Sequence, residues 1–140
     1  MLEKICDEYP ESTAIIYEEK KTTYRELKEK VDRLENAWKN IGVKQGDRIG
    51  LMLANHPDYI VSNYAAQMLG AIVVQVHPMY TVRELQEIVA DVEMRFIVVS
   101  DSNRSSIEEL GSESHFDAVF LSDDPESGRK ILHYLHLFIL

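Results

Sequence analysis

The stretch from Asp47 to Leu85 constrains the fold more than any other part of the sequence. An apolar run at residues 48–53 is followed by Asn55-His56-Pro57, a helical pattern that ends at Gly70, and a second apolar run at residues 72–76. Strand, turn, helix and strand in this order make one βαβ unit, which requires a parallel sheet and a crossover that is nearly always right-handed. Neither apolar run alternates with polar residues, as expected for strands that are covered on both faces.

The residues before this unit predict a helix, a hairpin and a longer amphipathic helix. Residues 2–7 suit a short helix, and the runs at 14–17 and 21–24 flank Glu18-Glu19-Lys20 like two short strands or a small hairpin. Thr23 and Glu26 are spaced for a capping box at a helix start. Apolar residues then recur at steps of three and four up to Gly42, a natural left-handed stop, and Trp38 is expected in the core: Tyr24, Leu27, Val31, Leu34, Trp38 and Ile41.

The residues after this unit continue the alternation of helices and strands. Thr81 and Glu84 form a second capping-box pattern, with Tyr80 and Leu85 at the positions of a hydrophobic staple. Residues 85–92 carry the apolar face of that helix, residues 96–100 and 118–122 suit strands, and residues 105–110 suit a short helix with Glu108 three residues after its first serine. The predicted fold class is α/β, with a layered, mostly parallel sheet (βαβαβαβ) preceded by a β-hairpin and an amphipathic helix.

The predicted organisation is one subdomain at residues 1–122, followed by a loop and an apolar tail at residues 123–140. The loop is polar and contains Pro125 and Gly128, whereas residues 131–140 are apolar on nearly every side. Such an ending suggests a segment that packs against something outside the chain. Ten residues are too few to span a bilayer, so no transmembrane segment is expected.

Composition limits the possible partners and the compartment. The formal net charge of −9 argues against nucleic-acid binding, which needs a basic surface, and against binding to anionic membranes. Cys6 is the single cysteine, so no internal disulfide can form, and the N-terminus lacks a signal pattern. A cytoplasmic location is therefore expected.

Ligands of open parallel sheets bind beyond the carboxyl ends of the strands, and four predicted loops lie there. They carry Asn55-His56, residues 77–80, residues 100–103 and residues 122–124. None has the glycine density of a phosphate-binding loop. Asp123-Asp124 either holds a cation such as Mg²⁺ or forms a solvated turn. His133 and His136 are three residues apart, but no further ligand pair has metal-site spacing.

No nucleophile with a catalytic partner can be identified. His77 has no evident partner, and Cys6 lies in the N-terminal segment. The residues by themselves therefore predict a fold with no catalytic residue and no metal site.

Three segments resemble the acyl-adenylate-forming enzymes, also called the AMP-binding superfamily. Residues 22–27 (TTYREL) resemble the family's T-Y-x-E-L helix start, and residues 44–49 (KQGDRI) resemble its x-x-G-D-R-V entry to a central strand. Residues 69–85 (LGAIVVQVHPMYTVREL) resemble its K-A-G-A-x-x-x-x-x-N-P-x-Y-T-x-x-E-L segment, in the form typical of the fatty-acyl–CoA ligase branch. The likeness covers roughly residues 3–122, in order and with the family's spacing.

The resemblance implies an ATP-dependent ligase in its complete form. Such enzymes join a carboxylate to AMP with release of pyrophosphate, and then transfer the acyl group to the thiol of coenzyme A. Their cofactors are ATP, Mg²⁺ and coenzyme A, and the fatty-acid branch implies a long-chain fatty acid as substrate. His77 replaces the family's usual asparagine, and this chain lacks the Ser/Thr/Gly-rich phosphate loop, the later acidic motifs and the C-terminal domain with its catalytic lysine.

The resemblance thus identifies the chain as an N-terminal fragment of a long-chain fatty acid–CoA ligase. Adenylation needs groups that stabilise charge on the phosphates together with Mg²⁺, and these residues supply no such set. The fragment is expected to be inactive and to bind no cofactor by itself. A cut-off subdomain is also expected to self-associate through its uncovered apolar surface.

Arg83 is the one residue for which the resemblance implies a contact with a cofactor. In some relatives an arginine near the start of the corresponding helix meets the nucleotide phosphates of coenzyme A. The other interpretation of Arg83 is a solvated charge or an ion pair with Glu87, four residues later. Tyr80 is interpreted as the staple residue and His77 as a turn residue.

A second hypothesis is a self-contained α/β binding or interaction module without ligase chemistry. A response-regulator-like receiver is the obvious form, but receivers carry an acidic pair after an early strand. Residues 51–55 (LMLAN) contain no acidic residue.

Overall fold

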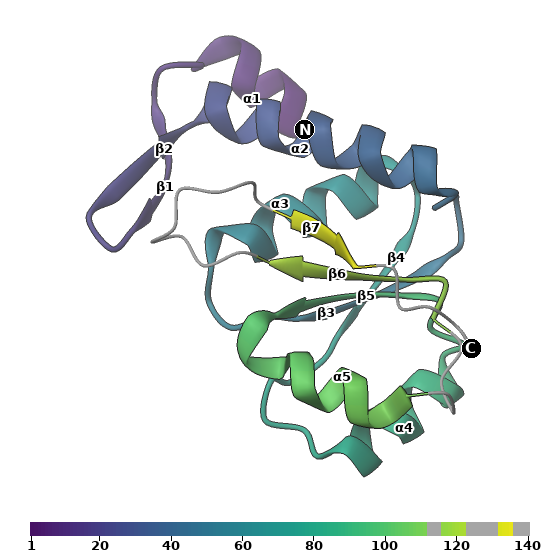
Figure 1. Ribbon diagram of the computed structural model, residues 1–140. Helices are drawn as coiled ribbons and strands as arrows, with labels where there is room; N and C mark the ends of the chain where they lie inside the picture. Colours follow the sequence, from purple (N-terminus) through teal and green to yellow (C-terminus); the bar gives the residue numbers. More distant parts are fainter. Residues whose placement is uncertain (112–115, 123–131, 136–140) are drawn as a thin grey trace.

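A five-stranded sheet forms the centre of the computed structural model, which describes residues 1–111, 116–122 and 132–135 (Figure 1). The strand order is β4-β3-β5-β6-β7. The first four strands in this order are parallel, and β7 pairs antiparallel with β6. Their bounds are β3 Arg48–Met52, β4 Ile72–Gln75, β5 Phe96–Ser100, β6 Ala118–Ser122 and β7 Leu132–Leu135. The predicted α/β fold with a mostly parallel sheet is confirmed.

Two helical layers cover the two faces of this sheet (Figure 1). Helices α2 (Tyr24–Ile41) and α3 (Pro57–Met68) pack on one face, where their apolar side chains join those of β3, β5 and β6 in one cluster. Helices α4 (Val82–Asp91) and α5 (Arg104–Leu110) pack on the other face around Leu85, Val89 and Ile107. Since both faces are covered, the strands are apolar at nearly every position.

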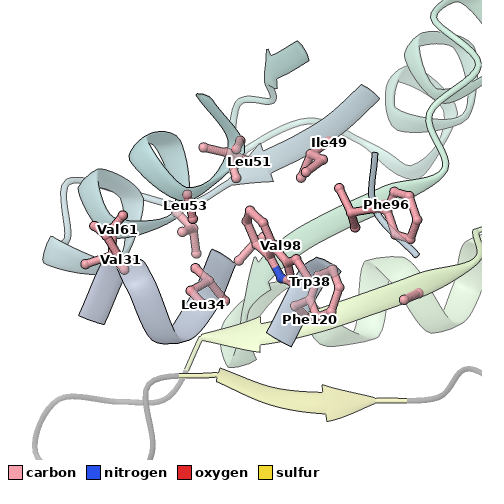
Figure 2. Close-up of a cluster of buried hydrophobic side chains, with 14 of the residues drawn as sticks. Val31, Leu34, Trp38, Ile49, Leu51, Leu53, Val61, Phe96, Val98 and Phe120 are labelled. Atoms are coloured by element: carbon pink, nitrogen blue, oxygen red, sulfur yellow. The ribbon is translucent and has the colours of Figure 1, made fainter. Parts of the chain in front are cut away.

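Trp38 is at the centre of the cluster beneath α2 and is fully buried, as predicted (Figure 2). Its ring lies 5.4 Å from that of Phe120, which in turn stacks on Phe96 at 6.4 Å between ring centroids. One long helix is thereby attached to the middle of the sheet, because Phe96 and Phe120 belong to two adjacent parallel strands.

Local side-chain chemistry sets the helix starts where the sequence predicted them. The Glu26 N–H donates to Thr23 Oγ1 at 3.2 Å, and the Thr23 N–H donates to Glu26 Oε2 at 2.8 Å. Thr81 and Glu84 repeat both bonds at the start of α4. Each box pairs backbone donors that a helix start otherwise leaves free. Gly42 ends α2 with φ +109°, a value that favours glycine.

A helix and a small hairpin precede the sheet, as predicted. Helix α1 (Leu2–Glu8) lies against α2, and β1 (Thr13–Tyr17) pairs antiparallel with β2 (Lys20–Thr23). The two turn residues between them, Glu18 and Glu19, have φ values of +47° and +67°. Positive φ at both central positions matches the right-handed twist of a two-residue hairpin.

A charged cluster joins three strands at their amino ends. Arg95, just before β5, forms an ion pair with Asp47 at 3.3 Å and a second one with Asp117, just before β6. Asp47 also accepts a hydrogen bond from the Lys44 N–H at 2.9 Å, and its side chain is 8% exposed. One guanidinium therefore ties the starts of β3, β5 and β6 together.

Two predicted segments differ in detail. The helix expected at residues 105–110 starts at Arg104, after a 3₁₀ turn, η1 (Asp101–Asn103). No side chain caps this helix, and the Glu108 carboxylate accepts from Arg104 Nε at 3.0 Å instead of bonding back to Ser105. The two segments expected as strands at 48–53 and 72–76 each end one residue earlier, as β3 and β4.

Part of the expected apolar tail is a strand. Residues 132–135 form β7 against β6, because an apolar run of strand-forming residues can pair with the open edge of a sheet. His133 lies in β7. The predicted loop with Pro125 and Gly128, the Asp123-Asp124 pair and His136 lie outside the described residues. Within the described residues, no helix is both long and apolar enough to cross a membrane.

Candidate ligand-binding edge of the sheet

The order of the strands singles out one place at the carboxyl edge of the sheet. From β3 the chain passes through α3 on one face to β4, and then through α4 on the other face to β5, on the far side of β3. The direction of winding therefore reverses between β3 and β5. In open α/β sheets, ligands bind beyond the carboxyl ends of the two strands at such a reversal.

The loops predicted to carry ligand contacts do follow carboxyl ends of parallel strands. Asn55 and His56 follow β3, residues 77–80 follow β4, and residues 101–103 follow β5. Ser122 ends β6, and the remainder of the fourth loop lies outside the described residues.

The first loop carries a compact polar cluster of His56, Asp58 and Ser122. His56 is the N-cap of α3, and its Nδ1 accepts the Asp58 N–H at 3.1 Å. The buried Asp58 carboxylate accepts the Ser122 hydroxyl, which joins the start of α3 to the end of β6. The His56 ring also meets the Tyr17 ring edge-on at 5.1 Å, so the hairpin is attached at the same point.

Sequence reasoning named the position of His56 but missed Asp58. Pro57 at the first helical position, followed by an acidic residue in the first turn, is a pattern that could have indicated it, because a carboxylate is favoured near a helix N-terminus. Its bond to Ser122 could not be inferred from sequence, since 64 positions separate the two residues.

Two loops at this edge are tied to each other by an amide. The side-chain Nδ2 of the buried Asn103 donates to the Pro78 carbonyl at 2.9 Å, which joins the loop after β5 to the loop after β4. His77 Nδ1 accepts the Met79 N–H at 3.0 Å and so closes a turn. The hydroxyl oxygens of Ser100 and Ser102 are 2.8 Å apart.

Arg83 projects from the first turn of α4, beside the loop after β4. Its side chain is 89% exposed, and its Nε lies 3.3 Å from Glu87 Oε1, which is the ion pair weighed from the sequence. Two exposed partners in water hold each other weakly. The guanidinium can therefore release the Glu87 carboxylate and bind another anion that it holds more tightly.

The described part of the carboxyl edge thus offers hydroxyl, imidazole and amide groups, the Asp58 carboxylate, and the two cations Arg83 and Arg104. Among the residues that the structure describes, no three His, Cys, Asp or Glu side chains lie close enough together to hold a metal ion. Burial raises the pKa of the Cys6 thiol, which keeps it protonated and poorly nucleophilic.

Comparison with known proteins shows the family to which the chain belongs. Residues 2–133 match the family model described as AMP-binding enzyme, and the chain therefore belongs to this family. The resemblance read from the three sequence segments is thereby confirmed.

Individual relatives are acyl–CoA ligases. The chain is 33% identical over 93 residues to the long-chain-fatty-acid–CoA ligase of Bacillus subtilis (strain 168), covering 66% of this chain and 17% of the relative. It is 27% identical over 107 residues to the crotonobetaine/carnitine–CoA ligase of Proteus mirabilis (strain HI4320), covering 73% of this chain and 21% of the relative. The chain thus spans about a fifth of the length of these two relatives.

A solved structure supports the fold. The benzoate CoA ligase from Burkholderia xenovorans LB400 superimposes with a TM-score of 0.81 at 20% identity, over 87% of this chain and 25% of that one.

Proposed function

We propose that this chain forms the N-terminal part, residues 1–122, of an ATP-dependent ligase that converts a long-chain fatty acid to its coenzyme A thioester. In the complete protein, the fatty-acid carboxylate joins AMP with release of pyrophosphate, and the acyl group then passes to the coenzyme A thiol. ATP, Mg²⁺ and coenzyme A are the cofactors of that complete protein.

The observation that carries this proposal is where the three family segments fall in the fold. Residues 22–27 build the capped start of α2, and residues 44–49 lead into β3 at the charged cluster. Residues 69–85 run from the end of α3 through β4 into the capped start of α4. The three segments therefore form two capped helix starts, the turn into β3 and the strand β4, which supports a shared role in building the sheet and its helical layers.

The choice of a long-chain fatty acid rests on the similarity to the Bacillus subtilis enzyme of that name. Other relatives are named for other acids, such as crotonobetaine/carnitine and acetate. A direct test is to sequence the DNA beyond the codon for Leu140 and to express the whole product of any frame that continues. Its acyl–CoA formation is then measured with acetate, benzoate and palmitate.

The expected result is a continuing frame with a Ser/Thr/Gly-rich loop and a preference for palmitate. A stop codon directly after Leu140 would contradict the ligase and favour a self-contained module. A working ligase that prefers acetate or benzoate would contradict the substrate but not the class.

Arg83 is proposed to contact a nucleotide phosphate of coenzyme A. Its exposed guanidinium stands near the N-terminus of α4, at the edge of the sheet where ligands bind. A planar guanidinium can donate two parallel hydrogen bonds to a phosphate. The phosphate would then replace the Glu87 carboxylate as the partner of Arg83.

The Arg83 contact can be tested in a chimera, in which residues 3–122 replace the matching segment of the Bacillus subtilis ligase. Arg83→Gln should raise the KM for coenzyme A roughly fivefold or more, the loss of about one charged hydrogen bond, and leave the KM for ATP unchanged. Arg33→Gln is the matched control, because Arg33 forms an exposed ion pair with Glu29, also four residues away, on α2 and outside the loops of the carboxyl edge. Equal effects of the two substitutions would contradict the proposed contact.

A further inference from the structure

One edge of the sheet is open to another strand. β4 ends the strand order, and in the described part of the chain it has a neighbour, β3, on one side. The N–H groups of Ile72 and Val76 donate to β3 and its flank, at 2.7 and 3.0 Å. Since backbone groups alternate in direction along a strand, the N–H and C=O of Val73 and Gln75 face the open side.

Exposed apolar residues are frequent in β4 and in the residues just before and after it. Among the exposed large hydrophobic residues, four belong to β4 or to the residues that flank it: Met68, Ile72, Met79 and Tyr80, with exposed fractions of 40%, 48%, 81% and 37%. Residues 68–80 contain no Asp, Glu, Lys or Arg, although 28% of the whole chain is charged.

The described edge carries none of three features that commonly keep sheet edges apart. Edge strands are commonly protected by a lysine, a proline or a bulge. β4 reads Ile-Val-Val-Gln and pairs with β3 in continuous register. The shortness of β4, four residues, limits the strength of an added pairing, but no residue within it blocks one.

We propose that two copies of this chain associate through β4, with the two β4 strands antiparallel about a two-fold axis at Val74. In this register Val73 of each copy lies opposite Gln75 of the other, and the pair exchanges both backbone hydrogen bonds. The contact is isologous and closes on itself, so it yields a dimer and no fibre.

The charge distribution restricts a contact between two copies to this edge. A net charge of −9 makes two copies repel each other over most of their surfaces. The uncharged stretch at residues 68–80 is where they can meet without placing like charges face to face. This inference concerns the 140-residue chain itself and does not depend on the ligase proposal.

The dimer should be weak. Two short strands with their flanking side chains bury less than the roughly 1,600 Å² of a standard interface, so we expect a concentration-dependent dimer with micromolar or weaker affinity. Sedimentation equilibrium over a range of concentrations measures this directly. The mean mass should rise from that of the 16.1 kDa chain towards twice that value.

Three variants locate the contact. Ile72→Lys places a charge at the edge, and Gln75→Pro removes an outward N–H; each should raise the dimer dissociation constant roughly tenfold or more. Ile16→Lys is the matched control, because Ile16 is a 68% exposed isoleucine on the separate hairpin. It should leave the constant unchanged. Circular dichroism verifies that each variant is folded.

A wild-type chain that stays monomeric at every concentration would overturn the proposal. Association that persists in Ile72→Lys would also overturn it, because another surface would then form the contact. Association that falls equally in Ile16→Lys would overturn it too, because it would show nonspecific hydrophobic association. If Gln75→Pro fails to fold, the dimer dissociation constants of Ile72→Lys and Ile16→Lys still test the proposal.

Discussion

At the scale of single residues, the capping carboxylate of Glu84 has a function that depends on pH. Its Oε2 accepts the Thr81 N–H at 2.7 Å, and this bond holds the pKa of Glu84 below its ordinary value of 4.5. A carboxyl whose pKa is lower in the folded than in the unfolded state stabilises the fold above its unfolded pKa. That stabilisation is lost as the pH falls through the folded pKa.

We therefore predict that Glu84→Gln lowers the free energy of unfolding at neutral pH and that the difference from wild type vanishes in acid. Urea unfolding, followed by circular dichroism at a series of pH values from neutral to below the folded pKa, measures this difference. Glu109→Gln, at an exposed position of α5, is the matched control and should show no such convergence. A difference that stays constant across this range would mean that the ionised cap is not its cause.

Trp38 allows a prediction that separates packing from hydrogen bonding. Its ring is fully buried against Phe120, while its Nε1 has no partner among the described residues. Trp38→Ala should cost about 3–5 kcal/mol in the free energy of unfolding. Trp38→Phe should cost clearly less, because it keeps an aromatic contact and removes a buried N–H with no partner.

Chemical unfolding of both variants, followed by circular dichroism, tests this order. Equal costs would indicate that the indole N–H is bonded in solution.

Residue-scale features were predictable from the sequence where they are local. Both capping boxes join residues three positions apart, so the spacing alone indicated them. The bond from Ser122 to Asp58 and the ion pair from Arg95 to Asp47 join residues 64 and 48 positions apart. Such contacts exist only after the strands are placed side by side, and for this reason the sequence did not reveal them.

At the scale of elements, Arg95 binds strand starts that are distant in sequence. Replacing it by methionine leaves the nearly buried Asp47 without its cation and frees Asp117 at the start of β6. We predict a loss of about 1–2 kcal/mol in the free energy of unfolding, below the cost of breaking a fully buried pair because Arg95 is 45% exposed.

Thermal or urea unfolding measures this loss. Arg33→Met is the control, since the Arg33–Glu29 pair lies on the surface at 3.8 Å with an arginine side chain that is 77% exposed. The prediction is wrong if both variants lose the same stability.

Strands were predictable where their own apolar residues indicate them, without a contribution from an adjacent strand. β5 and β6 occupy the residues that their uninterrupted apolar runs indicated. β7 was expected as a tail, because an apolar segment at residues 132–135 becomes a strand only when the edge of β6 is beside it. The strand order β4-β3-β5-β6-β7 is likewise a property of pairing and not of any one run.

At the scale of the whole molecule, the chain belongs to the AMP-binding enzyme family and spans about a fifth of the length of two relatives. We predict that the purified 140-residue chain neither hydrolyses ATP nor forms an acyl-adenylate, because this chemistry needs Mg²⁺ and, among the described residues, no three His, Cys, Asp or Glu side chains lie close enough together to hold a metal ion. Pyrophosphate exchange and acyl–CoA formation with palmitate are the measurements, with the Bacillus subtilis ligase as the positive control. Measurable acyl–CoA formation by the chain alone would contradict the prediction.

The place of the candidate site was predictable to the level of loops. A parallel sheet brings the carboxyl ends of its strands to one edge, so the loops after β3, β4 and β5 could be named from sequence. The sequence could not show which two of these loops lie where the winding reverses. This depends on the pairing of β5 with β3, and not with β4. The amide link from Asn103 to Pro78 and the cluster around Asp58 became visible only with the fold.

Different interactions hold the strands together at the amino and the carboxyl edges of the sheet. The amino end is held by the guanidinium of Arg95 between two carboxylates, whereas the carboxyl end is held by separate hydrogen bonds, from the Ser122 hydroxyl to the Asp58 carboxylate and from the Asn103 amide to the Pro78 carbonyl. Loops joined by single hydrogen bonds can change at a smaller cost in stability than strand starts that share an ion-pair cluster, so substitutions should be tolerated better at the carboxyl edge of this sheet than at its amino edge.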